Sequence, residues 1–248
     1  MTLTLVGTGK MALALAKGLH QKYALRIVGR TLEKAQTFLD THQLQGTAHA
    51  IEGYDIEGAH LILLVKPYAL ESVAQTVKGR AHTLYSVLAG TSIEKLHAID
   101  AEHYVRTMAN LAASVGHSMT TLTGDAHVQE SARAIFGAIG ATLWVESEKE
   151  LDIATALAGS GPAFLALIAE AFSDGAVRQG LKRADAYTLT QGLFAGFSQL
   201  LAQEHPALIK DATMSPNGTT AAGYAALEAA GVRHGCIRAI EEAYKKTL

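Results

Sequence analysis

Short apolar runs alternate with helical patterns through the first 147 residues of the chain. Six runs rich in β-branched and large apolar residues predict strands at residues 2–6, 24–28, 61–65, 83–87, 104–108 and 142–145. The clearest helix between them is predicted over residues 125–140, with Asp125 as a possible cap and Gly140 at its end. Such alternation predicts an α/β domain whose mostly parallel, doubly wound sheet is covered on both faces.

The strand signals disappear from Glu148 onward. The remaining residues are rich in alanine and leucine at helical spacing, interrupted only by short glycine- and proline-containing turns. We therefore predict two domains, a sheet domain over residues 1–147 and an all-α domain over residues 148–248.

Two stretches of the helical part, residues 153–169 and 186–203, contain no charged residue. Both are shorter than the ~20 continuous apolar residues that span a bilayer. Helices that are apolar around most of their circumference are buried on several sides. We interpret the two stretches as an interface with another subunit, and we expect no membrane association.

Composition narrows the classes of partner and compartment. The formal net charge of −2 offers no basic surface for a phosphate backbone, so we expect no nucleic-acid partner. Cys236 is the only cysteine, which excludes an intrachain disulfide and fits a reducing compartment. The apolar run after Met1 ends at Gly7, too short for a secretory signal, so we expect a cytoplasmic protein.

The eleven histidines do not form a familiar metal motif. No His-Glu-x-x-His pattern is present, and Asp100 with His103 predicts at most a surface pair. We therefore predict no metal site.

A glycine loop follows the first predicted strand and opens a helix from Lys10 to about Gln21. In the pattern Gly7-x-Gly9-x-x-Ala12, Gly7 permits a tight turn and Gly9 lets a pyrophosphate approach the backbone, while Ala12 permits close helix packing. Placed in a complete βαβ unit, this pattern predicts a dinucleotide site, although a glycine turn that binds nothing is the alternative.

The end of the second strand indicates which dinucleotide binds. NAD-binding units place a carboxylate there for the ribose hydroxyls, whereas this chain has Arg30 followed by Thr31. Arg30 can form charge-assisted bonds to a 2'-phosphate, with the Thr31 hydroxyl beside it. NADPH is therefore the predicted cofactor, with NADH also usable. The alternative is that Arg30 is solvated and Thr31 caps the next helix.

Other strand ends carry further candidate cofactor residues. In a doubly wound sheet these ends line the crevice at the carboxyl edge. We expect Asn110 to bond the nicotinamide amide, Lys66 to bring positive charge, and Pro67 and Gly90 to shape the turns. Ordinary turn chemistry explains Pro67 and Gly90 equally well, because proline and glycine commonly end strands.

A second loop, residues 215–220, precedes a helix that ends near Gly231. Backbone N–H groups of Gly218, Thr219 and Thr220 can form a cradle for a carboxylate, and the Ser215 hydroxyl adds a donor. This predicts a small acid as substrate. The alternative is ordinary N-capping of the helix by Thr219 or Thr220.

Taken together, these motifs closely resemble pyrroline-5-carboxylate reductases, in order and spacing over nearly the whole chain. The motifs that carry the resemblance are Gly7-x-Gly9-x-Met11-Ala12, Val65-Lys66-Pro67, Ala89-Gly90, Arg106-x-Met108-x-Asn110, Asp152-x-x-Thr155-Ala156-Leu157-x-Gly159-Ser160-Gly161-Pro162-Ala163, Asp174-Gly175 and Ser215-Pro216-x-Gly218-Thr219-Thr220. Ala109 stands where the family usually has proline and Asn217 where it usually has glycine. Asparagine tolerates a positive φ, so the turn at Asn217 can survive.

The resemblance implies a Rossmann domain followed by a helical dimerisation domain, and the NADPH-dependent reduction of 1-pyrroline-5-carboxylate to L-proline. It implies homodimers that often assemble further, commonly into decamers of five dimers. The implied substrate residues are Glu148, Ser215, Gly218, Thr219 and Thr220. The implied cofactor residues are Val6, Gly7, Thr8, Gly9, Lys10, Met11, Arg30, Thr31, Val65, Lys66, Pro67, Ala89, Gly90 and Asn110.

Thr220 is the residue that we expect to act catalytically, by a hydrogen bond from its hydroxyl, direct or through water, to the ring nitrogen. A hydroxyl has a poorly matched pKa for proton donation, so orienting a protonated iminium serves equally well. Two other functions compete: another two-domain NADP-dependent imine or hydroxyacid oxidoreductase, and a non-catalytic NADPH-binding regulator. The former usually needs a lysine or an acid–base pair in the helical domain, whereas Lys182 and Lys210 lie outside the small-residue motifs.

Overall fold

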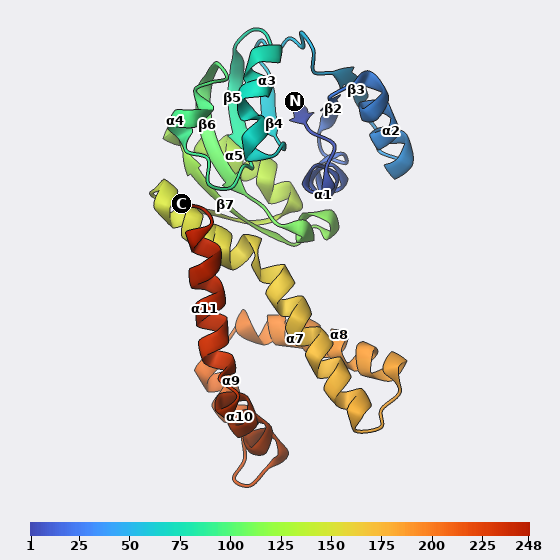
Figure 1. Cartoon of the computed structure of the whole chain (residues 1–248), viewed down its shortest axis with the longest axis vertical. Coiled ribbons are helices and arrows are strands. Elements are labelled where there is room, and N and C mark those ends of the chain that lie inside the picture. Colours follow the sequence, from blue (N-terminus) through green and yellow to red (C-terminus); the bar gives the residue numbers. More distant parts are fainter. The chain divides into compact units, whose positions relative to one another are not determined.

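The computed structural model describes residues 1–248, and the chain divides into two compact units (Figure 1). The sheet unit comprises Met1–Pro162 and the C-terminal residues Glu242–Leu248, and the helical unit comprises Ala163–Glu241. The last turn of the C-terminal helix thus belongs with the sheet, although it is remote from it in sequence.

One eight-stranded sheet forms the centre of the sheet unit. Its strands are β1 (Thr2–Val6), β2 (Ala24–Gly29), β3 (Thr47–Ala50), β4 (His60–Leu63), β5 (Ala81–Ser86), β6 (Ala101–Met108), β7 (Ser118–Gly124) and β8 (Gly140–Trp144). They lie in the order β3-β2-β1-β4-β5-β6-β7-β8, and only the β6–β7 pair is antiparallel. The order reverses between β1 and β4, which places the switch point beside the glycine loop. The predicted mostly parallel sheet is confirmed.

Helical segments cover both faces of this sheet. They are α1 (Lys10–Leu19), α2 (Leu32–His42), η1 (Pro67–Ala69), α3 (Leu70–Thr76), α4 (Ile93–Leu96), η2 (Leu111–Val115), η3 (Ala126–Val128), α5 (Gln129–Phe136), η4 (Gly137–Ile139), α6 (Glu148–Ala154) and η5 (Thr155–Gly159). Alternate residues of β4 point into two separate apolar cores, Ile62 into one and Leu61 and Leu63 into the other. Burial of both faces confirms the doubly wound class.

The structure corrects several predicted boundaries. Strands β3 and β7 were not predicted, because their sequences are dominated by threonine, alanine and other small or polar residues. The single helix expected over residues 125–140 is α5 flanked by two 3₁₀ turns, and Gly140, with φ +145°, begins β8. An added Cβ at Gly140 would come within 2.0 Å of the Ser118 carbonyl oxygen, so only glycine fits this strand pairing.

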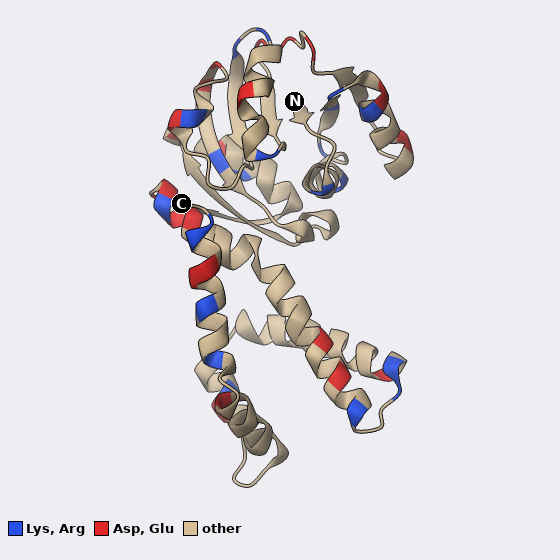
Figure 2. Cartoon of the chain, viewed as in Figure 1, with Lys and Arg blue, Asp and Glu red and all other residues tan.

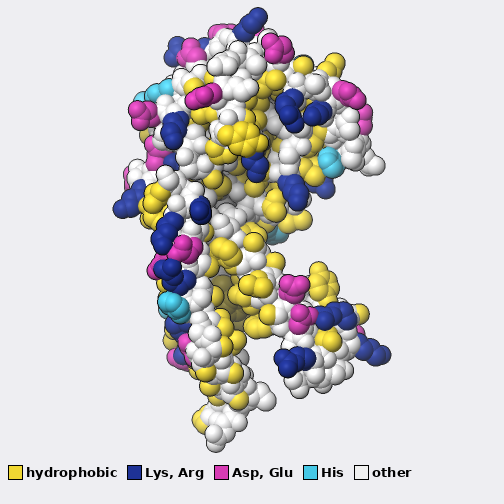
Figure 3. All heavy atoms as spheres, viewed as in Figure 1, with side chains coloured by type: hydrophobic (Ala, Val, Ile, Leu, Met, Phe, Trp, Pro, Cys, Tyr) yellow, Lys and Arg dark blue, Asp and Glu magenta, His cyan; other side chains and the backbone are white.

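The helical unit contains five helices with little buried surface of their own. They are α7 (Gly161–Arg178), α8 (Arg183–Leu201), α9 (Pro206–Thr213), α10 (Thr219–Ala229) and α11 (Val232–Lys245). In α8 only Ala186 and Thr190 are buried, and the Thr190 hydroxyl bonds Ser173 of α7 at 3.0 Å. Helices α7 and α8 carry few charged side chains (Figure 2). Hydrophobic side chains are exposed on the helical unit (Figure 3), among them Leu165 and Leu167 of α7 and Leu189 and Leu193 of α8. This unit therefore lacks a complete core within one chain.

The continuous helical span Glu148–Arg178, which includes α6, η5 and α7, is long and apolar enough by length and composition to cross a membrane. Its mean hydropathy is 1.6, and 17% of the most apolar window is buried. A single span of this kind is weak grounds for a membrane segment, because subunit interfaces have the same composition.

Candidate functional site

The glycine loop lies at the carboxyl edge of the sheet, between β1 and α1. Gly7 has φ +132°, and an added Cβ would come within 2.7 Å of the Leu64 carbonyl oxygen, so glycine is needed for both reasons. The Gly7 amide donates to Val28, and the Leu64 amide donates to Val6, each at 2.9 Å. The loop is thus fixed by the ends of β2 and β4 on either side.

The first turn of α1 presents unpaired backbone donors. Gly9 is the N-cap and, having no side chain, satisfies none of them, and no acidic residue lies in the first turn. Nothing lies within 4 Å of a Cβ built on Gly9, so a ligand can approach its backbone. An open helix N-terminus with this approach favours a pyrophosphate, and the predicted residues around Gly7 to Met11 therefore fit a dinucleotide.

Arg30 and Thr31 follow directly after β2. The Thr31 hydroxyl accepts a bond from the Lys34 amide at 3.2 Å, so Thr31 caps α2, as the alternative interpretation predicted. Arg30 is exposed beside it. The guanidinium is therefore accessible to a phosphate, whereas the Thr31 hydroxyl is already engaged as an acceptor and retains its own proton to donate.

The ends of β4 and β5 carry the next predicted residues. Lys66 is exposed and precedes the 3₁₀ turn η1, in which Pro67 takes the first position. Gly90 has φ +64°, and a Cβ there would come within 2.9 Å of the Thr247 carbonyl oxygen. A side chain at position 90 would therefore clash with the C-terminal residues of the same unit. The sequence does not reveal this contact.

Asn110, at the end of β6, is buried with 8% of its surface exposed. Its side-chain amide donates to the Ala158 carbonyl at 2.9 Å, and its side-chain oxygen accepts from the Ala112 amide at 3.0 Å. Asn110 therefore joins β6 to the π-helical turn η5. One amide proton and one lone pair of its side chain are left for a ligand.

Glu148 lies in the first turn of α6, where a Ser147–Glu150 capping box starts the helix. Its carboxylate accepts from Arg106 at 2.9 Å and from the Ile93 amide at 3.0 Å. Arg106 is only 2% exposed and also binds Asp152 at 2.7 Å. Arg106 and Asp152 stand in sequence motifs, but only the structure shows the ion pairs that join β6 to α6 and the Ile93 bond that adds α4.

The second predicted site lies in the helical unit, where the loop 215–220 leads into α10. Gly218 is the N-cap, so the alternative of capping by Thr219 or Thr220 is wrong, and no side chain bonds the first-turn amides. Asn217 has φ +57°, as predicted for the turn, and the Gly218 amide donates to Ser215 at 3.0 Å. A Cβ at Gly218 would come within 2.4 Å of Ser215 Oγ. The cradle is open and free of acidic neighbours in its first turn.

A charged cluster near the end of α10 holds this helix against its neighbours. Arg233 of α11 and Tyr224 donate to Glu228, and the bond from Arg233 is the main cause that lowers the pKa of Glu228 to about 2. Lys210 of α9 lies 5.5 Å from the centroid of the Tyr224 ring, and its bond to Asp211 raises its pKa. Lys210 stays a cation, which does not suit a general base.

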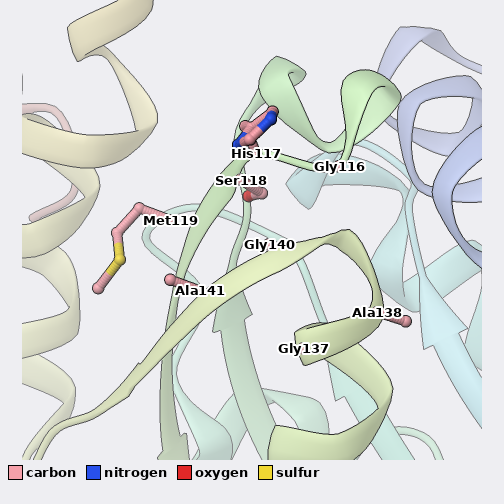
Figure 4. A pocket seen from close by; sticks show the side chains of 8 residues that line it. All are labelled: Gly116, His117, Ser118, Met119, Gly137, Ala138, Gly140 and Ala141. Carbon is pink, nitrogen blue, oxygen red and sulfur yellow. The ribbon is translucent and has the colours of Figure 1, made fainter. Parts of the chain in front are cut away.

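The hollow shown in Figure 4 lies elsewhere on the sheet unit, with a volume of about 450 Å³. Its lining comes from the start of β7, from η4 and from the start of β8, for example Ser118, Ala138 and Ala141. None of the predicted site residues lines it, so we assign it no role in the chemistry.

The pair expected between Asp100 and His103 is wrong. Asp100 instead lies 3.5 Å from the guanidinium of Arg80, and His103 bonds Asp125 at the start of η3. The bond from His103 is the main cause that lowers the pKa of Asp125 to about 2. Asp125 is 22 residues from His103 in sequence and reaches it only because β6 and β7 pair.

Two family models match separate parts of the chain. Residues 148–248 match the family model described as pyrroline-5-carboxylate reductase dimerisation, and residues 2–90 match the model described as NADP oxidoreductase, coenzyme F420-dependent. The chain is also 37% identical to the pyrroline-5-carboxylate reductase of Synechocystis over 99% of its own length and 96% of the relative's.

Solved structures of similar chains share the fold over the full length. The 1-pyrroline-5-carboxylate reductase of Streptococcus pyogenes is 31% identical with a TM-score of 0.85, covering 100% of this chain and 98% of the other. A Plasmodium falciparum pyrroline carboxylate reductase with NADP bound is 25% identical with a TM-score of 0.83, over 100% and 98% of the two chains. The α/β fold with a helical C-terminal part is thus common to all three.

Proposed function

Because the chain belongs to the pyrroline-5-carboxylate reductase family, we propose that it reduces 1-pyrroline-5-carboxylate to L-proline, with NADPH as the hydride donor, as the last step of proline biosynthesis. The observation in the structure that carries this proposal is the first turn of α10. It offers uncapped backbone donors with no acidic neighbour, as a small carboxylate requires.

We propose that NADPH binds at the carboxyl edge of the sheet. The pyrophosphate would take the open first turn of α1, and Arg30 would pair with the 2'-phosphate, which NADH lacks. Val65, Lys66 and Ala89 would line the crevice farther along. When bound, the cofactor supplies a hydride for the C=N carbon, so the protein's own task is to orient and to manage charge.

In the proposed substrate site, the amides of Gly218, Thr219 and Thr220 hold the carboxylate, and Ser215 adds a hydroxyl donor. The Thr220 side chain, in the second position of α10, donates a hydrogen bond to the ring nitrogen directly or through water. A hydroxyl has a poorly matched pKa for proton donation, so holding a protonated iminium is as suitable a role for Thr220 as delivering the proton.

We propose that Glu148 is a positioning residue and does not itself contact the substrate. Its carboxylate is bound by Arg106 and by the Ile93 amide, which suits a residue that fixes the start of α6 better than one that leaves its position to bind substrate. We further propose that the substrate and dimerisation domain begins at residue 148, where the matched family model begins, although the compact sheet unit continues to Pro162.

An assay of NADPH absorbance with 1-pyrroline-5-carboxylate tests the proposed function. The purified chain should oxidise NADPH only when the substrate is present, and L-proline should form in equal amount. A chain that binds NADPH but oxidises none of it with this substrate would be a regulator. Oxidation with a hydroxyacid or another imine, but not with pyrroline-5-carboxylate, would indicate the other class of oxidoreductase.

Arg30→Ala tests the cofactor assignment. We expect KM for NADPH to rise about tenfold, since a charge-assisted bond to phosphate contributes roughly 1.5–3 kcal/mol and solvent reduces this at an exposed position. KM for NADH should change much less. Steady-state kinetics with both cofactors measure the difference, and equal weakening for NADH and NADPH would refute the assignment. Thr31→Ser, which keeps the cap of α2, is the matched control.

The protein is a homo-oligomer built through its helical part, which matches a dimerisation family. We propose a dimer as the basic unit, with five dimers forming a decamer. We also propose a cytoplasmic location, which the unpaired and exposed Cys236 supports.

Along α8, Leu189, Leu193 and Phe197 recur every four residues and are each more than 40% exposed. Such a stripe requires a cover, and a second copy of the same helices supplies one.

Leu193→Glu tests this interface. A carboxylate placed in the apolar stripe should be too costly to bury, so the species of twice 26.1 kDa or larger should give way to monomer. Light scattering after size-exclusion chromatography measures the mass. Leu143→Glu, the same change at an exposed leucine of the sheet unit, should leave the dimer intact. A dimeric Leu193→Glu chain would contradict the assignment of the stripe.

A further inference from the structure

Three histidines lie in a row across the amino-terminal part of the sheet, at the edge opposite the glycine loop. Thr83 of β5 pairs in register with His60 of β4 on one side and His103 of β6 on the other. The ring of His82 lies between them, with centroids 4.8 Å from His60 and 5.5 Å from His103. Sheet pairing therefore gathers imidazoles that are about twenty residues apart in sequence.

Glu102 joins two of these imidazoles. One ligand atom each from His82, Glu102 and His103 lies within 4.8 Å of the others. Both rings are half-buried, and Glu102 is exposed, so its carboxylate can rotate toward them. Ligand atoms of a tetrahedral zinc ion lie about 3.4 Å apart, given bonds of roughly 2.0–2.1 Å, so modest side-chain rotation closes the set.

Each of the two rings is also held by a second group at its Nδ1. His103 Nδ1 bonds Asp125 Oδ2 at 2.5 Å, and His82 Nδ1 bonds the hydroxyl of the fully buried Thr83 at 2.8 Å. Asp125 is fixed in turn by the His127 amide at 2.9 Å. Ligating histidines commonly donate their other nitrogen to a carboxylate, which fixes the ring and increases its basicity. Nε2 of both rings is thereby left for a metal.

We propose that His82, Glu102 and His103 bind one Zn²⁺ ion per chain, with Asp125 as the group that orients His103. Two imidazoles and a carboxylate are a ligand set that zinc accepts, and the fourth position is open to water. The site lies at the start of β5 and β6, whereas the proposed cofactor residues follow the ends of the strands. The ion therefore clamps these two strands and takes no part in hydride transfer.

Titration of the chelator-treated full-length protein with ZnSO₄, followed by calorimetry, tests the site. Wild type should bind one Zn²⁺ per chain at this site, and the double variant His82→Gln/His103→Gln should lose it. Asp125→Asn, which removes the orienting carboxylate, should weaken binding by about 10- to 100-fold. His20→Gln/His117→Gln removes the same number of histidines elsewhere in the sheet unit and should change nothing.

Glu102→Gln keeps the test decisive if the double histidine variant fails to fold, because the Glu102 side chain is exposed. It should weaken Zn²⁺ binding at least about tenfold while the circular dichroism spectrum stays that of wild type. Co²⁺ added to wild type should give the visible absorption of a four-coordinate site, and this absorption should be absent from the variant. Equal Zn²⁺ affinity of wild type and Glu102→Gln would overturn the proposal.

Discussion

Thr220→Ala is expected to lower kcat for pyrroline-5-carboxylate reduction by roughly 100-fold, the usual cost of removing one donor from a charge-stabilising site. The hydroxyl would no longer hold the ring nitrogen, whereas the backbone amides would still hold the carboxylate, so KM should change less than kcat. NADPH binding should be unaffected, because the proposed cofactor residues belong to the other compact unit.

Thr220→Ser is the matched control, since it keeps the hydroxyl and should retain most of the activity. Neither variant should lower the melting temperature by much, because Gly218, and not Thr220, caps α10. Steady-state kinetics at saturating NADPH measure both parameters. If Thr220→Ala turned over at the wild-type rate with the wild-type KM, the catalytic assignment of Thr220 would be wrong.

Arg106→Met should destabilise the protein strongly, and far more than a change at an exposed ion pair. Arg106 is 2% exposed and binds two carboxylates, so its removal leaves Glu148 and Asp152 without their cation in partly buried positions. Breaking such a buried pair costs roughly 3–5 kcal/mol, and the solvent that reaches Glu148 favours the lower figure. The melting temperature should fall by roughly 6–12 °C for a chain of this size.

Two further variants separate this effect from a loss of packing. Arg80→Met makes the same change at the exposed Arg80–Asp100 pair and should shift stability by less than about 0.5 kcal/mol. Adding Glu148→Gln and Asp152→Asn to Arg106→Met removes the uncompensated charges and should recover part of the loss. Calorimetric or fluorescence melting measures each. A melting temperature for Arg106→Met equal to that of Arg80→Met would contradict the proposed role of the buried ion pairs.

The six predicted strands and the glycine loop were accessible from sequence because their signals are local. Leu61, Ile62 and Leu63 are apolar because both faces of β4 are covered, and this shows directly as an uninterrupted apolar run. β7 was missed for the opposite reason. Thr120 and Thr121 are buried, but polar residue types do not indicate burial in a sequence. They are buried because β6 and β8 pair with β7 on either side and supply its hydrogen bonds.

The candidate sites also contain features that depend on adjacent residues and features that depend on distant ones. The cradle at Gly218 and the loop at Gly7 could be predicted, since each depends on a few adjacent residues and on the free amides of the helix that follows. The cap at Thr31 was predicted only as an alternative. Asn110 was predicted to face the cofactor, but only the structure shows its amide bound to Ala158 of a distant turn.

The sequence by itself determined the alternation of strands and helices, the helical second part and the two loops with free helix N-termini, because period and turn chemistry act over fewer than about twenty residues. The tertiary structure alone decided that Arg106 meets Glu148 and Asp152, and that His82, Glu102 and His103 converge beside Asp125. These groups come together through strand register and helix docking, which are set by the summed burial of the whole sheet unit and are not encoded at any one position.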